Sequence, residues 1–182
     1  MRERAPLVGG RQELSDVAHS SSHSVGCFGT VLPLTERARH ALGVARNHAA
    51  DMGADYVDTG HVFLGVLAEP EGIAAVALSD LGFQPEEVAE RLRTLEGVCE
   101  DRAEGASAFS RPTKMAIECG LQEARVLGCS HADTHHVVLG LLRAAHTYSG
   151  VKCAFGSAVG FEDRLRIRNE ILRLAPRPPR RA

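Results

Sequence analysis

The sequence contains no tryptophan, and aromatic residues make up only 4% of its 182 residues, although 44% are hydrophobic. A hydrophobic fraction of this size supports a folded core and excludes global disorder. A β-sandwich would require more aromatic and β-branched residues, whereas closely packed short helices can be built from Ala, Leu and Val. The composition therefore favours an all-α fold.

Neither sign of charge dominates the chain. Its 21 basic and 23 acidic residues leave a formal net charge of −2, so no global field favours nucleic acid or an anionic membrane surface, and we expect neither as a partner. No apolar run approaches the roughly 20 residues of a membrane span. The first residues also lack the hydrophobic segment of a secretory signal, so we expect none.

The five cysteines form no CxxC pair and no regular disulfide framework. This usage fits a reducing compartment and predicts a cytoplasmic protein. Cys119 and Cys153 lie in apolar helical stretches and are expected to be inert core thiols. No GxxxxGK[ST] phosphate-binding motif is present, so we expect no nucleotide site and no cofactor.

A duplication with an offset of 75 residues organises the chain. Leu34–Arg39 (LTERAR) aligns with Phe109–Lys114 (FSRPTK), and Asp58–Gly65 (DTGHVFLG) aligns with Asp133–Gly140 (DTHHVVLG). Chance does not easily produce two matches in one register. The sequence therefore predicts two consecutive copies of one structural unit.

Each copy is predicted to contain four helices, about eight in all, related by pseudo-symmetry. Thr35 and Ser110 are N-cap candidates for the first helix, because a hydroxyl can accept from a backbone N–H of the first turn. Gly53 and Gly128 are expected to end that helix in the left-handed conformation.

The remaining helices follow from apolar patterning and charge placement. Thr59 and Thr134 are expected to open a second helix that is apolar on every side and therefore buried. A third, Ala-rich helix is predicted at about 72–81 and 150–158. A fourth begins with acidic residues, which are favourable at the positive end of a helix.

The organisation expected along the chain has five parts. Residues 1–30 are predicted to be a flexible arm, 31–100 the first repeat, 101–108 a linker, 109–175 the second repeat and 176–182 a basic tail. The two repeats together form one domain, which we expect to be a monomer. The tail is expected to be a solvated terminus rather than a docking site.

Three motifs carry a resemblance to a known family. They are Thr-Glu-Arg-Ala-Arg from Thr35, Gly-x-x-Tyr-x-x-Thr-x-His from Gly53 and Leu-Gly-x-Leu from Leu64, all in a duplicated chain. Residues 31–175 thereby resemble the Clp N-terminal (Clp R) domain, most closely its ClpC branch. In that family the domain precedes AAA+ modules and receives substrates and adaptors, so the resemblance implies a non-enzymatic peptide- or protein-binding domain.

The loops before the second helices depart from the family pattern. That pattern usually reads Gly-Thr-Glu-His in both copies, and in ClpC-type domains the Glu helps to hold the guanidinium of phosphoarginine. Here the loops read Thr59-Gly60 and Thr134-His135, without the carboxylate. Losing one partner of a buried charge pair costs about 2–5 kcal/mol. We therefore expect phosphoarginine recognition to be lost or badly weakened.

A second surface of the family is retained. Positions matching Arg39, Phe109, Lys114 and Glu118 bind cyclic-peptide antibiotics in actinobacterial ClpC-type domains, and the resemblance extends to Leu34 and, with a departure from the family's Phe, to Val31. An aromatic anchor among charges of both signs suits a peptide. Two other interpretations stay open: Phe109 as a core residue, and the cations as an ordinary solvated face.

The leading hypothesis is therefore a binding protein for peptides or cyclic-peptide natural products, acting as a decoy that spares ClpC. An alternative is an adaptor or competitor that delivers or withholds Clp substrates. A rival from another class is a metal-dependent or thiol enzyme that uses the segment 129–136, which contains Cys, His and Asp. The duplication already explains Asp133, Thr134 and His136, so we expect no metal site.

Overall fold

The computed structural model describes residues 32–94, 109–147 and 159–175, all of them in one compact unit that begins at Leu32. The described elements are helices, with no strand longer than an isolated bridge. They are α2 (Glu36–Asp51), α3 (Thr59–Leu67), α4 (Ile73–Asp80), α5 (Pro85–Thr94), α6 (Arg111–Val126), α7 (Thr134–Thr147) and α9 (Phe161–Leu174). The predicted all-α fold is confirmed. The expected arm, linker, basic tail and helix at 150–158 lie outside the described residues.

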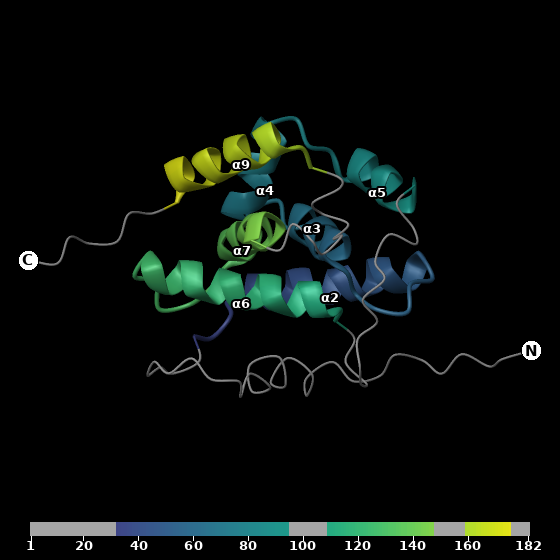
Figure 1. The fold of residues 1–182 in the computed structure, drawn as a ribbon, viewed down its shortest axis with the longest axis horizontal. Helices are drawn as coiled ribbons and strands as arrows, with labels where there is room; N and C mark the ends of the chain where they lie inside the picture. The colour runs from purple at the N-terminus through teal and green to yellow at the C-terminus, as the bar shows by residue number, and fades with distance from the viewer. Residues whose placement is uncertain (1–31, 95–108, 148–158, 176–182) are drawn as a thin grey trace, which may run out of the picture. The chain divides into compact units, whose positions relative to one another are not determined.

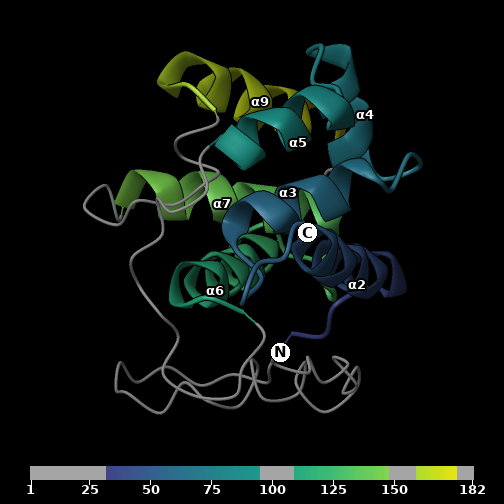
Figure 2. The ribbon, with the colours of Figure 1, turned by 90° about the vertical axis from the view of Figure 1, so that its right-hand side faces the viewer.

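The helices stack in three layers. The first helices of the two copies, α2 and α6, form one outer layer, and the second helices, α3 and α7, form the middle layer (Figures 1 and 2). On the opposite side lie α4, α5 and α9, which pack against the middle layer and, for α4 and α9, against each other. The middle layer is thus covered on both sides. This explains why α3 is apolar on every face in the sequence.

The ends of the first helices follow the predicted signals. The hydroxyl of Thr35 accepts a hydrogen bond from Ala38 N at 3.1 Å, and the hydroxyl of Ser110 accepts one from Thr113 N at 3.4 Å. Gly53 and Gly128 each follow the helix with a φ of 71°, a conformation that side chains with a Cβ rarely adopt. The N-cap and C-terminal glycine predictions are confirmed in both copies.

Close packing of the first helix on the second depends on one glycine in each copy. A Cβ on Gly65 would lie 2.1 Å from the carbonyl oxygen of Ala41, and a Cβ on Gly140 would lie 2.2 Å from that of Ala116. The two contacts are related by the 75-residue offset. Because the obstructing atoms are backbone atoms, a methyl group fits only if the helices move apart.

Replacing either glycine by alanine is expected to destabilise the domain. In Gly65→Ala and Gly140→Ala, overpacking against backbone should lower the free energy of unfolding by about 1–3 kcal/mol, despite the better helix propensity of Ala. Urea denaturation followed by circular dichroism measures the change. Gly43→Ala is the matched control: it lies in α2 with nothing within 4 Å of its Cβ, and it should leave stability unchanged or raise it. A loss in Gly43→Ala equal to that in Gly65→Ala would contradict the packing explanation.

Within the described ranges, no helix combines the length and apolarity needed to cross a lipid bilayer.

Candidate binding face and interlocked loops

The two repeats are joined by a reciprocal pair of backbone contacts. Leu34 forms an isolated parallel bridge with Ala132, and Phe109 forms the same kind of bridge with Val57. Each bridge joins the start of the first helix in one copy to the loop before the second helix in the other. The first bridge maps onto the second by the 75-residue offset. The predicted pseudo-symmetry therefore takes the form of a reciprocal exchange: the loop before the second helix of each copy pairs with the segment that leads into the first helix of the other.

Hydrogen bonds reinforce both bridges. Thr35 N donates to Ala132 O at 2.9 Å, and Ser110 N donates to Val57 O at 3.0 Å. The same backbone groups would otherwise be unsatisfied at the beginning of a helix, where burial without a partner is costly. The exchange thus supplies hydrogen-bond partners that neither copy could supply alone.

Two aspartates connect these loops to the opposite copy through their side chains. Asp58 Oδ1 accepts from Thr59 N at 2.6 Å and from the Ser110 hydroxyl at 3.4 Å. Asp133 Oδ1 accepts from Thr134 N at 2.8 Å and from the Thr35 hydroxyl at 2.9 Å. Each carboxylate therefore caps its own second helix and also contacts the N-cap residue of the other copy's first helix. Sequence reasoning assigned the opening of these helices to Thr59 and Thr134 and missed the two aspartates as caps.

One cation adds to the second of these contacts. Arg37 Nη1 lies 3.5 Å from Asp133 Oδ2, and the two side chains are 37% and 19% exposed. Since the pair is partly screened by solvent, its contribution to stability is modest. It nevertheless places a positive charge beside the loop that carries Thr134 and His135.

The recurring histidines complete the caps. His61 Nδ1 accepts a hydrogen bond from Asp58 N, and His136 Nδ1 accepts one from Asp133 N, both at 3.0 Å. A histidine three residues after the cap thus acts as Glu or Gln does in a capping box. Both histidines thereby help to order the loop that precedes their helix.

Burial keeps the histidines of the second copy neutral. His135 and His136 are 4% and 1% exposed, with ring centroids 3.9 Å apart. Burial lowers the pKa of His135. The pKa of His136 is lowered to about 4, mainly by burial and secondly by the neighbouring His135. Asp133 opposes both shifts, because its negative charge favours protonated histidine. Protonating His136 Nδ1 would also remove the acceptor for Asp133 N.

We expect stability to fall in mildly acidic solution for this reason. The unfolded chain takes up a proton at His136 near the ordinary pKa of 6.5, whereas the folded chain does so only near 4. Stability is therefore fully present above pH 6.5 and decreases as the pH falls from 6.5 towards 4. Chemical denaturation at pH 7 and pH 5 measures the decrease.

His136→Gln is the matched variant, since Gln can still accept from Asp133 N but does not titrate. Its loss of stability between pH 7 and pH 5 should be clearly smaller than that of the unmodified chain. An identical pH dependence in the two proteins would show that His136 is not the titrating group.

The structure corrects one interpretation of Phe109. Its side chain is 0% exposed, so it is a core residue and not an exposed anchor. The guanidinium carbon of Arg46 lies 4.9 Å from the ring centroid, which places a cation from α2 over an aromatic ring at the start of α6. Sequence reasoning left the core interpretation open but did not identify Arg46 as the covering residue.

The other residues of the predicted surface remain accessible to some degree. Arg39 has a side chain that is 44% exposed and donates to Leu34 O at 2.8 Å. Lys114 and Glu118, one turn apart on α6, are half-buried, as is Leu34. We call Leu34, Arg39, Lys114 and Glu118 the α2–α6 face. Arg39 and Lys114 are equivalent positions of the two copies, and α2 and α6 share one layer (Figure 2). Val31 lies outside the described residues.

The four loop positions compared with the phosphoarginine motif are buried. They are Thr59, Gly60, Thr134 and His135. They stand in the first turns of α3 and α7, which begin at Thr59 and Thr134. Both loops are engaged in the exchange between the repeats. The hydroxyl of Thr134 and Nδ1 of His135 are buried without a hydrogen-bond partner among the described residues.

Polar side chains of the segment 129–136, considered above as metal ligands, make structural hydrogen bonds instead. Asp133 caps α7 and contacts the other copy, and His136 Nδ1 accepts from the backbone. Within the described ranges, no three His, Cys, Asp or Glu side chains are grouped as metal ligands. Cys119 is buried, and burial raises the pKa of its thiol, in keeping with the predicted inert core cysteine.

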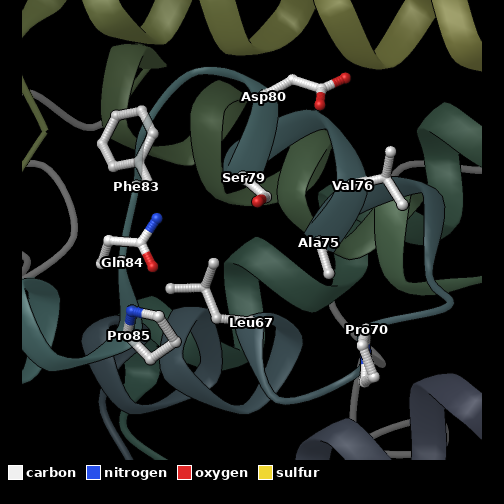
Figure 3. Close-up of a pocket in the computed structure, with 9 residues that line it drawn as sticks. All are labelled: Leu67, Pro70, Ala75, Val76, Ser79, Asp80, Phe83, Gln84 and Pro85. Carbon is white, nitrogen blue, oxygen red and sulfur yellow. The ribbon is translucent and has the colours of Figure 1, made fainter.

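A pocket that sequence reasoning missed lies beside α4. We call it the α4 pocket; its volume is about 260 Å³. Its wall combines the end of α3, one side of α4 and the segment leading into α5 (Figure 3). The lining residues are Leu67, Pro70, Ala75, Val76, Ser79, Asp80, Phe83, Gln84 and Pro85. Because they come from three separate segments, no local sequence pattern indicates the pocket.

The geometry defines a class: an internally duplicated, all-helical domain whose copies interlock through the loops before their buried helices. The family model of the Clp repeat (R) N-terminal domain matches residues 33–150. The chain therefore belongs to that family, and the resemblance inferred from the sequence motifs is confirmed.

The relatives are much longer proteins, and this chain matches only one part of each. The negative regulator of genetic competence ClpC/MecB of Bacillus subtilis is 38% identical over 109 residues, and the chaperone protein ClpB of Oceanobacillus iheyensis is 37% identical over 109 residues. Each match covers 60% of this chain and 13% of the relative. This chain thus corresponds to a small part of either relative.

Solved structures agree with the fold. The N-terminal domain of ClpD from Arabidopsis thaliana matches with a TM-score of 0.60 at 21% identity, covering 82% of this chain and 97% of that domain. The ClpV N-domain, solved in complex with a VipB peptide, matches with a TM-score of 0.58 at 16% identity, covering 86% of this chain and all of that one.

Proposed function

We propose that this chain is a non-enzymatic module that binds peptides or proteins through the α2–α6 face. The observation that carries the proposal is that Arg39 and Lys114, equivalent cations of the two copies, stand on the two helices of one layer. Arg39 contacts the half-buried Leu34, and Lys114 is one turn from the half-buried Glu118. Membership of the Clp repeat family supports it, as does the ClpV N-domain, a fold relative solved with a bound peptide.

The chemistry of the face suits a ligand with an apolar body and a polar backbone. Leu34 offers partly exposed apolar surface, while the charges of both signs around it can pair with peptide carbonyl and amide groups. The buried ring of Phe109, at the start of α6, lies 4.9 Å from the guanidinium carbon of Arg46 on α2, so this contact joins the two helices. Its contribution is therefore to hold α2 and α6 in place.

The finer proposal is that the chain acts as a decoy for cyclic-peptide natural products that target ClpC. The matched residues of the α2–α6 face favour it, together with the missing loop carboxylates. Protection by titration requires roughly stoichiometric protein and a dissociation constant well below the ligand concentration. The alternative is an adaptor or competitor in Clp proteolysis, which predicts binding to ClpC, its substrates or its adaptors instead.

Binding at the α2–α6 face is tested by thermal shift with a panel of apolar cyclic peptides. We expect a peptide that binds to raise the melting temperature by several degrees, and Lys114→Glu to weaken it at least about tenfold, because removing one partner of a desolvated charge contact costs more than about 1.4 kcal/mol. Arg125→Glu, an exposed cation near the far end of the same helix, is the control.

Phe109→Ala is unsuitable for this test, because truncating a fully buried Phe costs about 3–5 kcal/mol of stability. Equal stabilisation of Lys114→Glu and the unmodified chain would place the ligand elsewhere. Binding to an isolated ClpC protein without any response to cyclic peptides would favour the adaptor alternative over the decoy.

Loss of phosphoarginine recognition gives a separate prediction. Gly60 offers no side chain, and His135 is buried with its pKa lowered, so neither can supply the anion that a guanidinium requires. Calorimetric titration with free phosphoarginine should show no binding in the micromolar range, whereas a ClpC N-domain with both glutamates serves as positive control. Micromolar binding by this chain would overturn the prediction.

A further inference from the structure

The α4 pocket has an apolar floor and polar groups at its edge. The apolar lining includes the buried Leu67 and Ala75 and the half-buried Phe83, whereas the polar lining residues Ser79 and Gln84 are exposed (Figure 3). Val76 is 40% exposed, which is unusual for an aliphatic side chain in this otherwise well-packed helix. The pocket thus leaves apolar surface uncovered by any described residue.

The surroundings of the pocket are acidic. Asp80 lines it and is exposed, and the next helix, α5, begins at the lining residue Pro85 and continues with the exposed Glu86 and Glu87. One described cation near this region is Arg173 of α9. It interacts with Asp80 but also donates hydrogen bonds to the carboxylate of Glu170 on the same helix, so part of its charge is already neutralised. A basic ligand would therefore meet favourable charge here.

The end of α9 lies close to this acidic edge. Helix α9 packs against α4 and passes above Asp80 in Figure 3. It ends at Leu174, one residue after Arg173, the residue whose charge interacts with Asp80. The chain then continues with the sequence PRPPRRA, which has three arginines and three prolines in seven residues.

We propose that the α4 pocket is a docking site for a proline- and arginine-rich segment, and that its occupant is residues 176–182 of this chain. Proline rings fit shallow pockets lined by aromatic and proline side chains, here Phe83, Pro70 and Pro85. The arginines pair with Asp80, Glu86 and Glu87. Sequence alone favoured a solvated terminus; the acidic pocket beside the end of α9 supplies the reason for docking.

Length and tethering favour this occupant over a free peptide of the same composition. Seven residues in a polyproline conformation extend about 20 Å. A segment attached so near its site has an effective concentration in the millimolar range, so even a weak intrinsic affinity keeps the site largely occupied. External segments of similar chemistry would have to compete with the tail. This inference is independent of the α2–α6 face.

The test uses the full chain, a chain shortened to end at Ala175, and a labelled synthetic peptide PRPPRRA. The shortened chain keeps the last hydrogen bond of α9, from Ala175 N to Ile171 O, and circular dichroism checks that its helix content is unchanged. Fluorescence anisotropy should show saturable binding to the shortened chain and at least about tenfold weaker binding to the full chain, because the tethered tail competes. Equal binding to both chains, or none to the shortened chain, would overturn the proposal.

Variants of the shortened chain locate the site. Asp80→Asn should weaken peptide binding about two- to fivefold, as expected for an exposed charge pair, whereas Asp51→Asn, an exposed carboxylate on α2, should not change it. Ser79→Arg should abolish binding, because the arginine fills the pocket and carries a positive charge that repels the basic peptide. A peptide with alanines in place of the prolines should bind at least several-fold more weakly; equal binding would mean charge attraction without docking, and the proposal would fail.

Discussion

Asp58 and Asp133 do two tasks at once, and the rest of the domain depends on them. Each carboxylate caps the buried helix of its own repeat and accepts a hydrogen bond from the N-cap hydroxyl of the other repeat's first helix. Together with the reciprocal bridges Leu34–Ala132 and Val57–Phe109, they fix α2 and α6 on one side of the buried pair α3 and α7. The positions of α2 and α6 relative to each other therefore depend on contacts between the two copies.

Much of this architecture could be predicted from the sequence, because the decisive signals are local. A hydroxyl at Thr35 and Ser110, a glycine at Gly53 and Gly128, and an all-apolar second helix each follow from short-range chemistry. The 75-residue offset supplies the symmetry. The exchange between loops could not be predicted in the same way, since it pairs residues far apart in the sequence: Asp58 and Ser110 are 52 positions apart, and Thr35 and Asp133 are 98.

The candidate site was predicted less well, for a related reason. The duplication shows that Arg39 and Lys114 are equivalent, and both prove accessible, but it does not show what lies over Phe109. That ring is covered by Arg46, a residue from the other repeat with no distinctive sequence context. Similarly, Asp80 and Arg173 come from α4 and α9, so the charge environment of the α4 pocket appears only once the chain is folded.

The central claim is that the two repeats form one cooperative unit through their exchanged caps. Native-state hydrogen exchange in Asp133→Ala tests it most directly, because Asp133 contacts α2 and α7 but none of its hydrogen bonds reaches α3. If the repeats unfold as one unit, the amides of α3 lose protection by the same factor as those of α7. Protection of α3 that stays unchanged while α7 alone exchanges faster would contradict it.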